Sequence, residues 1–271
     1  MGEYTEAPTR RGFGCGVRVL FALAIVGYAL FRYFSQTEVN PVTGEKQHIA
    51  MTVDQEVALG LESAPEMARQ MGGEADSSDP NWKRVEATGR KVVGNSDASR
   101  SPYKFDFHLL SDPDTLNAFA LPGGQVFITD GLLVKLENDA QLAGVLGHEI
   151  GHVVNRHGAE HMATGQLGQL LTMAAGVAAT DEQGRGQRAA MVAAMINQMV
   201  QLKYSRSDEL EADRVGMDYM TQAGYDPAEM LGVMRILAEA SRGGRTPVML
   251  STHPYPEQRI EEIQRYLAAR K

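Results

Sequence analysis

Two histidines and a glutamate stand together in the six-residue segment GHEIGH, residues 147–152. The apolar run before it, LAGVL at 142–146, predicts a buried helix. Because residues four apart share one face of a helix, His148 and His152 can bind the same metal ion. Glu149 lies one step round the helix, within reach of a water on that ion without being a ligand itself. The spacing therefore predicts a zinc site with Glu149 as the general base.

A catalytic zinc ion needs three protein ligands, which leaves one coordination position open for chemistry. His157 and His161 follow nearby, but His157 is five residues beyond His152 and off the face of the two ligands. A later segment, SRSDELEAD at 205–213, supplies carboxylates on another predicted helix. We therefore expect Glu209 to be the third ligand, although a glutamate on a charged helix can also be simply solvated.

On that later helix, Glu209, Asp213 and Gly216 share one face, whereas Glu211 points elsewhere. The small residues on this face would let the helix closely approach the one that carries the histidines. Glu209 followed by Asp213 is similar to the gluzincin arrangement, in which the aspartate accepts a hydrogen bond from the first ligand histidine. By this resemblance, Asp213 is expected to fix the tautomer of His148.

From about residue 50 to about residue 265, the chain resembles the membrane-associated gluzincin family that includes CAAX prenyl proteases, HtpX and BepA-like periplasmic peptidases. Four segments carry the resemblance: NAFALPGG at 117–124, the residues 148–152, the residues 205–213, and STHPYP at 251–256. With one N-terminal apolar segment, the chain is more similar to single-anchor periplasmic members than to multi-spanning ones. The resemblance implies an endopeptidase with one Zn²⁺ per chain and with proteins or peptides as substrates.

The same resemblance gives His253, in the segment at 251–256, a position near the metal. There it is expected either to stabilise the oxyanion or to occupy the fourth zinc position when the enzyme is silent. From the residues alone, a histidine before a proline can instead simply shape a loop between helices. The sequence does not decide between these alternatives.

The elements that must hold these residues predict an α+β fold, a mostly helical zincin domain with a small β-sheet. A capping box at Thr52 starts a helix that Pro65 is expected to kink or end, and Asp79 caps a second helix. Alternating apolar residues predict strands near 105–109, 117–121 and 125–129. Helical patterns dominate from Asp139 onward, interrupted by a predicted mobile loop at 181–188.

The third predicted strand is a candidate dock for substrate, because zinc endopeptidases commonly bind an extended peptide against an edge strand. The alternative is that it belongs to an ordinary core hairpin. The candidate docking residues are Gln125, Val126, Phe127, Ile128 and Thr129.

The N-terminal part predicts a membrane anchor that precedes the catalytic domain. We expect a cytoplasmic tail at 1–16, a transmembrane signal anchor or cleaved signal peptide at 17–34, a linker at 35–50, and a zinc metallopeptidase domain at 51–271. Arginines before the apolar segment favour an N-terminus that stays in the cytoplasm. The expected location is the inner membrane, single-pass, with the domain in the periplasm.

The net charge of −8 argues against nucleic acid as a partner, and the single cysteine, Cys15, cannot form an intramolecular disulfide. The combined prediction is a zinc endopeptidase in envelope protein quality control. One alternative is a periplasmic chaperone or assembly factor that uses the same groove with little cleavage. Another is a zinc hydrolase of small amides, which would have an enclosed pocket.

Overall fold

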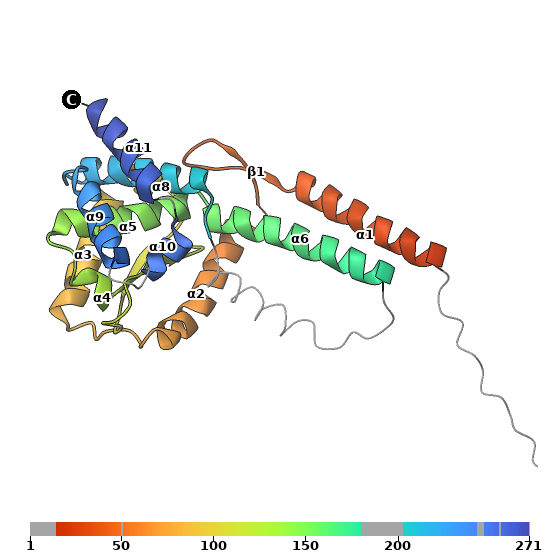
Figure 1. Ribbon diagram of the computed structural model, residues 1–271, viewed down its shortest axis with the longest axis horizontal. Helices are drawn as coiled ribbons and strands as arrows, with labels where there is room; N and C mark the ends of the chain where they lie inside the picture. Colours follow the sequence, from red (N-terminus) through yellow and green to blue (C-terminus); the bar gives the residue numbers. More distant parts are fainter. Residues whose placement is uncertain (1–14, 50, 180–202, 243–246, 255, 271) are drawn as a thin grey trace, which may run out of the picture.

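The computed structural model describes residues 15–49, 51–179, 203–242, 247–254 and 256–270. These residues form a mostly helical molecule with two small sheets, in agreement with the predicted α+β class. Figure 1 shows a rounded body from which two long helices project side by side, α1 (Cys15–Ser35) and α6 (His157–Ala179). The predicted loop at 181–188 and most of the predicted tail at 1–16 lie outside the described residues.

The main sheet has three strands in the order β3-β5-β4, with bounds Asp106–Leu110, Gln125–Thr129 and Ala118–Leu121. β3 runs parallel to β5, whereas β4 pairs with β5 in the antiparallel sense across the turn at 122–124. Gly123 and Gly124 have φ values of 87° and 107°, a left-handed conformation that glycine adopts at no steric cost. The predicted strand positions therefore agree with the structure to within about one residue.

The place of β5 in this sheet contradicts its prediction as a substrate dock. Both of its edges are paired, and all five residues from Gln125 to Thr129 are buried. An extended peptide has no free edge to bind there, because each backbone group already has a strand partner. The alternative of a core hairpin is what the structure contains. The outer strand on this side is β4, and no strand among the described residues pairs with its other edge.

Helices make up the rest of the body, and the predicted caps are present at Thr52 and Asp79. Pro65 does not end its helix, because Leu61, whose carbonyl loses a partner, lies on the exposed side where water can replace it. The helices of the body are α2 (Val53–Gln70), α3 (Pro80–Gly94), the 3₁₀ turn η1 (Asp97–Arg100), α4 (Asp130–Leu133), α5 (Asp139–Val154), α8 (Arg206–Gln222), α9 (Glu229–Arg242), α10 (Val248–Thr252) and α11 (Pro256–Ala268).

Helix α5 runs through the centre of the body, with every residue from Gln141 to Val154 buried. It packs between β4 on one side and α8 on the other, with α3 and α9 beside it. The approach to α8 is close, since a Cβ on Gly216 would lie 2.9 Å from the backbone nitrogen of His148. Small residues thus bring the two helices together at the level of the predicted ligands.

The segment predicted as a linker at 35–50 contains a short hairpin. β1 (Thr37–Val39) pairs antiparallel with β2 (Lys46–His48). Asn40 in its turn is buried and donates to the carbonyl of Val154, at the end of α5, at 2.8 Å. Tertiary hydrogen bonds, which turn-rich composition does not reveal, therefore hold this segment. None of the helices in the described part of the chain is both long and apolar enough to cross a membrane.

Candidate metal centre

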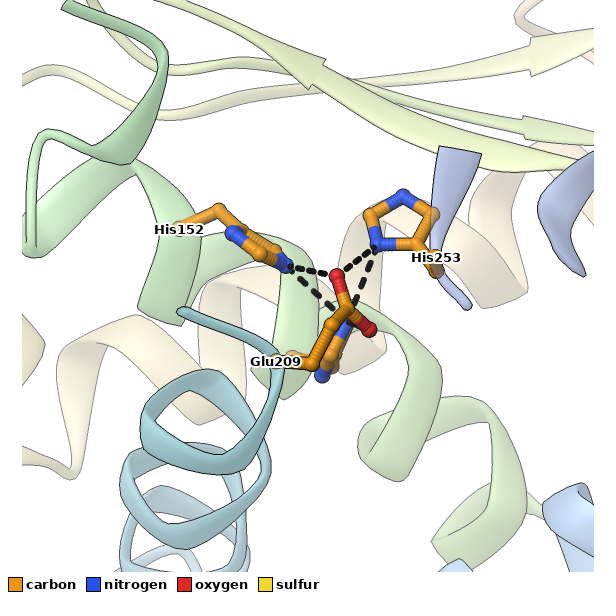
Figure 2. Close-up of side chains that lie close together, drawn as sticks. His152, Glu209 and His253 are labelled. Atoms are coloured by element: carbon orange, nitrogen blue, oxygen red, sulfur yellow. Dashed lines mark hydrogen bonds and ion pairs between the residues drawn. The ribbon is translucent and has the colours of Figure 1, made fainter. Parts of the chain in front are cut away.

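Four side chains from three separate helical regions converge on one buried point. His148 and His152 come from α5, Glu209 from the first turn of α8, and His253 from the residue that follows α10. One ligand atom from each lies within 4.8 Å of all the others. Figure 2 shows the Glu209 carboxylate between the rings of His152 and His253. The structure thus brings together the three predicted ligands and His253.

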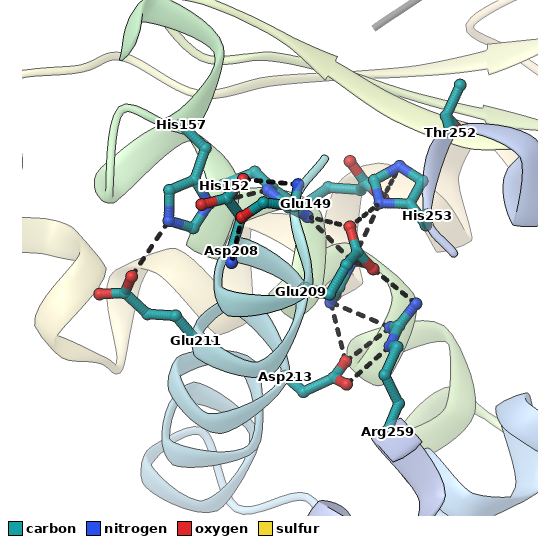
Figure 3. Close-up of polar contacts among 12 residues, drawn as sticks. Glu149, His152, His157, Asp208, Glu209, Glu211, Asp213, Thr252, His253 and Arg259 are labelled. Carbon is teal, nitrogen blue, oxygen red and sulfur yellow. Dashed lines mark hydrogen bonds and ion pairs between the residues drawn. The ribbon is translucent and has the colours of Figure 1, made fainter. Parts of the chain in front are cut away.

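Hydrogen bonds to the outer nitrogen of each helix histidine orient its ring. His148 Nδ1 lies 2.9 Å from Asp213 Oδ1 and 3.3 Å from Arg259 Nη2, and the shorter contact, to a carboxylate that only accepts, favours the proton on this nitrogen. His152 Nδ1 lies 2.9 Å from His157 Nδ1, and His157 Nε2 lies 3.2 Å from Glu211 Oε2 (Figure 3). A neutral His157 that donates to Glu211 must accept from His152. Both ligand rings therefore direct an Nε2 lone pair inward.

The inward-facing atoms fit a zinc ion. The two Nε2 atoms are 3.1 Å apart, and with the protons on the Nδ1 atoms neither Nε2 can donate to the other. Further separations are 3.4 Å from His152 Nε2 to Glu209 Oε1, 3.0 Å from that oxygen to His253 Nδ1, and 3.3 Å from His253 Nδ1 to His148 Nε2. The second Glu209 oxygen, Oε2, lies 3.6 Å from His148 Nε2. Ligands about 2.0–2.1 Å from a tetrahedral zinc ion are roughly 3.3 Å from one another. Imidazole and carboxylate are also the donors that zinc prefers.

Glu149 lies beside this cluster and is fully buried, with both carboxylate oxygens lacking a hydrogen-bond partner among the described residues. His253 lies next to it, with Nε2 3.5 Å from Glu149 Oε1. A buried carboxylate without partners is costly unless a ligand or a water completes it. The unpartnered carboxylate of Glu149, together with the separations of the four ligand atoms, therefore fits a metal ion with a reacting water.

Charges around the centre are strongly coupled. Burial would raise the pKa of Glu209, but the charge of Arg259 and contacts with the histidines outweigh it and hold the pKa well below its usual range. For His253, burial alone would lower the pKa, but the carboxylates of Glu149 and Glu209 raise it instead. For His152, burial dominates and keeps the pKa well below its ordinary value, which favours the neutral ring that a metal needs.

Three residues of the centre were missed or dismissed by sequence reasoning. Its spacing excludes His157 as a ligand of the same ion, but His157, the first residue of α6, contacts His152. Glu211 does not face the metal, yet it accepts from His157. Arg259 of α11 is fully buried against Asp213, and no motif spacing indicated it. Contacts between side chains from different elements carry no signature in one sequence.

A cavity of about 290 Å³ opens beside the centre, along the outer strand β4. Most of its wall is apolar, formed by Met67, Met71, Phe119, Leu121 and Met162, and His253 lines it on the side of the metal centre. The ring of Tyr204, another wall residue, stacks on His152 with ring centroids 3.9 Å apart. The cavity therefore connects the outer strand to the metal centre.

Comparisons with known proteins agree with this geometry. A family model described as Peptidase family M48 matches residues 80–267. The chain is 33% identical over 241 residues to the beta-barrel assembly-enhancing protease of Yersinia pestis, covering 83% of this chain and 46% of that protein. It is 30% identical over 251 residues to the mitochondrial metalloendopeptidase OMA1 of Schizosaccharomyces pombe, covering 92% and 71%.

A third relative is the Escherichia coli beta-barrel assembly-enhancing protease, which is 30% identical over 265 residues, covering 92% of this chain and 51% of that protein. The chain thus spans about half the length of the beta-barrel assembly-enhancing proteases that it matches. The family match covers more than half of the chain and includes every residue of the metal centre. The chain belongs to peptidase family M48.

Proposed function

We propose that this protein is a zinc endopeptidase in which His148, His152 and Glu209 hold one zinc ion. The observation that carries the proposal is the convergence of their ligand atoms beside the unpartnered carboxylate of Glu149. A zinc ion there would polarise the scissile carbonyl and acidify a water. Asp213 and His157 hold the two ligand rings with their inner nitrogens free of protons.

Glu149 acts as the general base in the proposed mechanism. Its carboxylate takes a proton from the attacking water and later gives that proton to the leaving amine. Burial and the lack of hydrogen-bond donors leave both oxygens free to accept, which a structural glutamate would not need. A base positioned in this way contributes about 10²- to 10⁴-fold to the rate.

His253 is proposed to close the fourth metal position in the conformation described here. Its Nδ1 lies 3.0 Å from Glu209 Oε1 and 3.3 Å from His148 Nε2, so it occupies the place that the reacting water needs. Movement of this residue, which follows the short helix α10, would open the site. This geometry favours the silencing role of His253 over the oxyanion role.

The free edge of β4 replaces β5 as the proposed substrate dock. A peptide paired with that edge would lie over the apolar cavity and reach the metal centre past His253. Main-chain pairing would bind many sequences, as peptide addition to an exposed edge generally does. A cavity that opens along a free strand edge fits a polypeptide better than a small amide, the substrate in the alternative hydrolase hypothesis.

Membrane attachment through α1 and action on envelope proteins complete the proposal. The support is that α1 exposes many large apolar side chains, namely Val17, Val19, Leu20, Phe21, Leu23, Tyr28, Leu30, Phe31 and Phe34. Two matched relatives are named a beta-barrel assembly-enhancing protease and a mitochondrial metalloendopeptidase. We propose a periplasmic catalytic domain that degrades misassembled proteins. Retention of the protein in membranes after alkaline carbonate extraction tests the attachment, and full release would contradict it.

The protease assignment is tested by cleavage of an unfolded protein by the full chain in detergent. Wild type is compared with Glu149→Gln and with Glu66→Gln, a control at a partly exposed glutamate of α2, and bound zinc is quantified in all three. We expect zinc in all, and cleavage by wild type and the control only. If all bind zinc and none cuts, the assay is repeated with His253→Ala. Activity that then appears supports a silenced enzyme, whereas continued inactivity favours the chaperone alternative.

A further inference from the structure

Arg259 is the largest side chain that the body buries completely, with 0% of its surface exposed. It comes from the first half of α11, a helix that otherwise contributes nothing to the metal centre. A buried guanidinium is costly unless its donors are paired, so its partners indicate why it is there. Figure 3 shows that it points at Asp213 and Glu209.

Arg259 contacts two carboxylates, and its Nη2 also lies 3.3 Å from His148 Nδ1. Its Nε and Nη2 donate to the two oxygens of Asp213 at 2.7 and 2.6 Å, a two-pronged pair that fixes the carboxylate plane. Its Nη1 forms an ion pair with Glu209 Oε2 at 2.7 Å. The other oxygen, Glu209 Oε1, lies 3.4 Å from His152 Nε2 and 3.0 Å from His253 Nδ1, whereas Oε2 lies 3.6 Å from His148 Nε2. Arg259 is thus ion-paired with Oε2, the outer oxygen, although the two atoms form no hydrogen bond, and Oε1, the inner oxygen, is the one without a cationic partner of this kind.

The charge of Arg259 also suits a divalent ion. Three carboxylates, those of Glu149, Glu209 and Asp213, are buried around one guanidinium. With neutral imidazoles, this set carries two net negative charges, which a divalent cation balances. A lysine would keep the charge, but its single ammonium group cannot contact both carboxylates with the same planar geometry.

Building on the proposed zinc site, we propose that Arg259 is a positioning residue that makes Glu209 a one-oxygen ligand. It does so by pairing with the outer oxygen of Glu209 while it locks Asp213 against His148. A one-oxygen carboxylate keeps the ion four-coordinate, with His253 or a water in the remaining position. Loss of the arginine lets Glu209 rotate and offer both oxygens.

The test measures zinc affinity by competition with a chromophoric chelator, and coordination by the visible spectrum of the Co²⁺-substituted protein. Arg259→Lys and Arg259→Met are compared with Arg265→Met, a control at an exposed arginine of the same helix. We expect both Arg259 variants to bind zinc about 10- to 100-fold more weakly. Their Co²⁺ bands should weaken, as five-coordination requires, whereas the control should match wild type.

Folded Arg259 variants with wild-type zinc affinity and an unchanged Co²⁺ spectrum would overturn the inference while the zinc site itself stands. Absence of zinc from wild type would instead overturn the proposed function. X-ray absorption of the zinc-loaded wild type gives a further test that does not depend on how the variants fold. One Glu209 oxygen at about 2.0 Å supports the inference, and two equidistant oxygens contradict it.

Discussion

The two buried charged clusters along α5 differ in how completely their charges are paired. The arginine cluster, just past the C-terminal end of the helix, consists of Arg156, Glu56, Glu38 and Tyr103. Arg156 donates to Glu56 at 2.9 Å, to Glu38 at 2.7 Å and to the carbonyl of Met51 at 3.0 Å. The Tyr103 hydroxyl donates to the other oxygen of Glu56 at 2.6 Å. Protein groups alone therefore complete this cluster.

The metal cluster lies in the second half of α5, where residues of α8, α11 and the end of α10 meet it, and protein groups do not complete it. Its residues are His148, Glu149, His152, Glu209, Asp213, His253 and Arg259. Among the described residues Glu149 has no hydrogen-bond partner, and the Nε2 atoms of His148 and His152 lie 3.1 Å apart. Both clusters bury charged groups, so the presence of buried charges alone does not identify a functional site. A site for a ligand is indicated where charges and lone pairs converge without protein partners. Four predictions test this distinction.

The largest effect is expected from His152→Ala, which removes a ligand from the metal cluster. Zinc affinity should fall by roughly 100- to 1,000-fold, because a ligand set shares about 10–16 kcal/mol of binding energy. Proteolysis should fall to background, as measured with an unfolded substrate, and zinc content by atomic absorption. His108→Ala, a histidine on β3 away from the centre, serves as the control. A variant that keeps full zinc and activity would remove His152 from the site.

Arg156→Met should break the arginine cluster and destabilise the fold without weakening zinc binding. It leaves Glu56 buried without its cation, a loss of about 3–5 kcal/mol in the free energy of unfolding by urea. Burial raises the pKa of Glu56, and Arg156 opposes this rise. In the variant the pKa of Glu56 rises further, so the free energy of unfolding falls as the pH rises through that pKa. The loss of stability relative to wild type should therefore be smaller at about pH 5 than at about pH 8. Weaker zinc binding in the folded variant would show that the clusters are coupled.

His157→Ala tests whether the residues behind the ligands belong to the metal cluster. In this variant the Nδ1 proton of His152 has no acceptor, and the ring loses its fixed orientation. Zinc affinity should therefore fall by about 10- to 100-fold. His157→Asn retains an acceptor and should restore part of the loss. The control is His161→Ala. His161 lies on the same helix as His157 and contacts Asp208, so its loss should leave the zinc affinity nearly unchanged. Equal losses in all three variants would indicate a general packing effect.

The smallest effect is expected from Asn40→Ala, which detaches the hairpin β1–β2 from the end of α5. The variant loses the bonds to the Val154 carbonyl and to Gln47, and should be destabilised by about 1–2 kcal/mol in urea. Thr43→Ala in the same turn should change stability by less than about 0.5 kcal/mol. An unchanged free energy of unfolding in Asn40→Ala would show that attachment of the hairpin does not contribute to stability.

Sequence reasoning predicted most of the helical body, because caps and periodicity are local signals. Thr52 and Asp79 begin helices as expected, and the strands near 106–110, 118–121 and 125–129 were all anticipated. The order of those strands was not predictable, because pairing depends on contacts distant in sequence. For this reason the sequence predicts a docking strand at 125–129, whereas β5 lies in the middle of the sheet.

The candidate site shows the same limit. The spacing of His148 and His152 on one helix fixed their shared face, and Glu209 lies where the predicted approach of two helices puts it. Arg156, Arg259 and Glu56 lie in no recognisable pattern, because each acts through a partner on another element. The orphaned carboxylate of Glu149 could be recognised only once its surroundings were known.

The central claim is that the metal cluster, and not the arginine cluster, is completed by a cation. The most direct measurement is an anomalous difference map at the zinc absorption edge, from crystals of the full chain equilibrated with Zn²⁺. We predict a single strong peak within about 2.0–2.2 Å of His148 Nε2, His152 Nε2 and Glu209 Oε1. A well-ordered crystal with no peak at that point, or with its zinc bound elsewhere, would contradict the account.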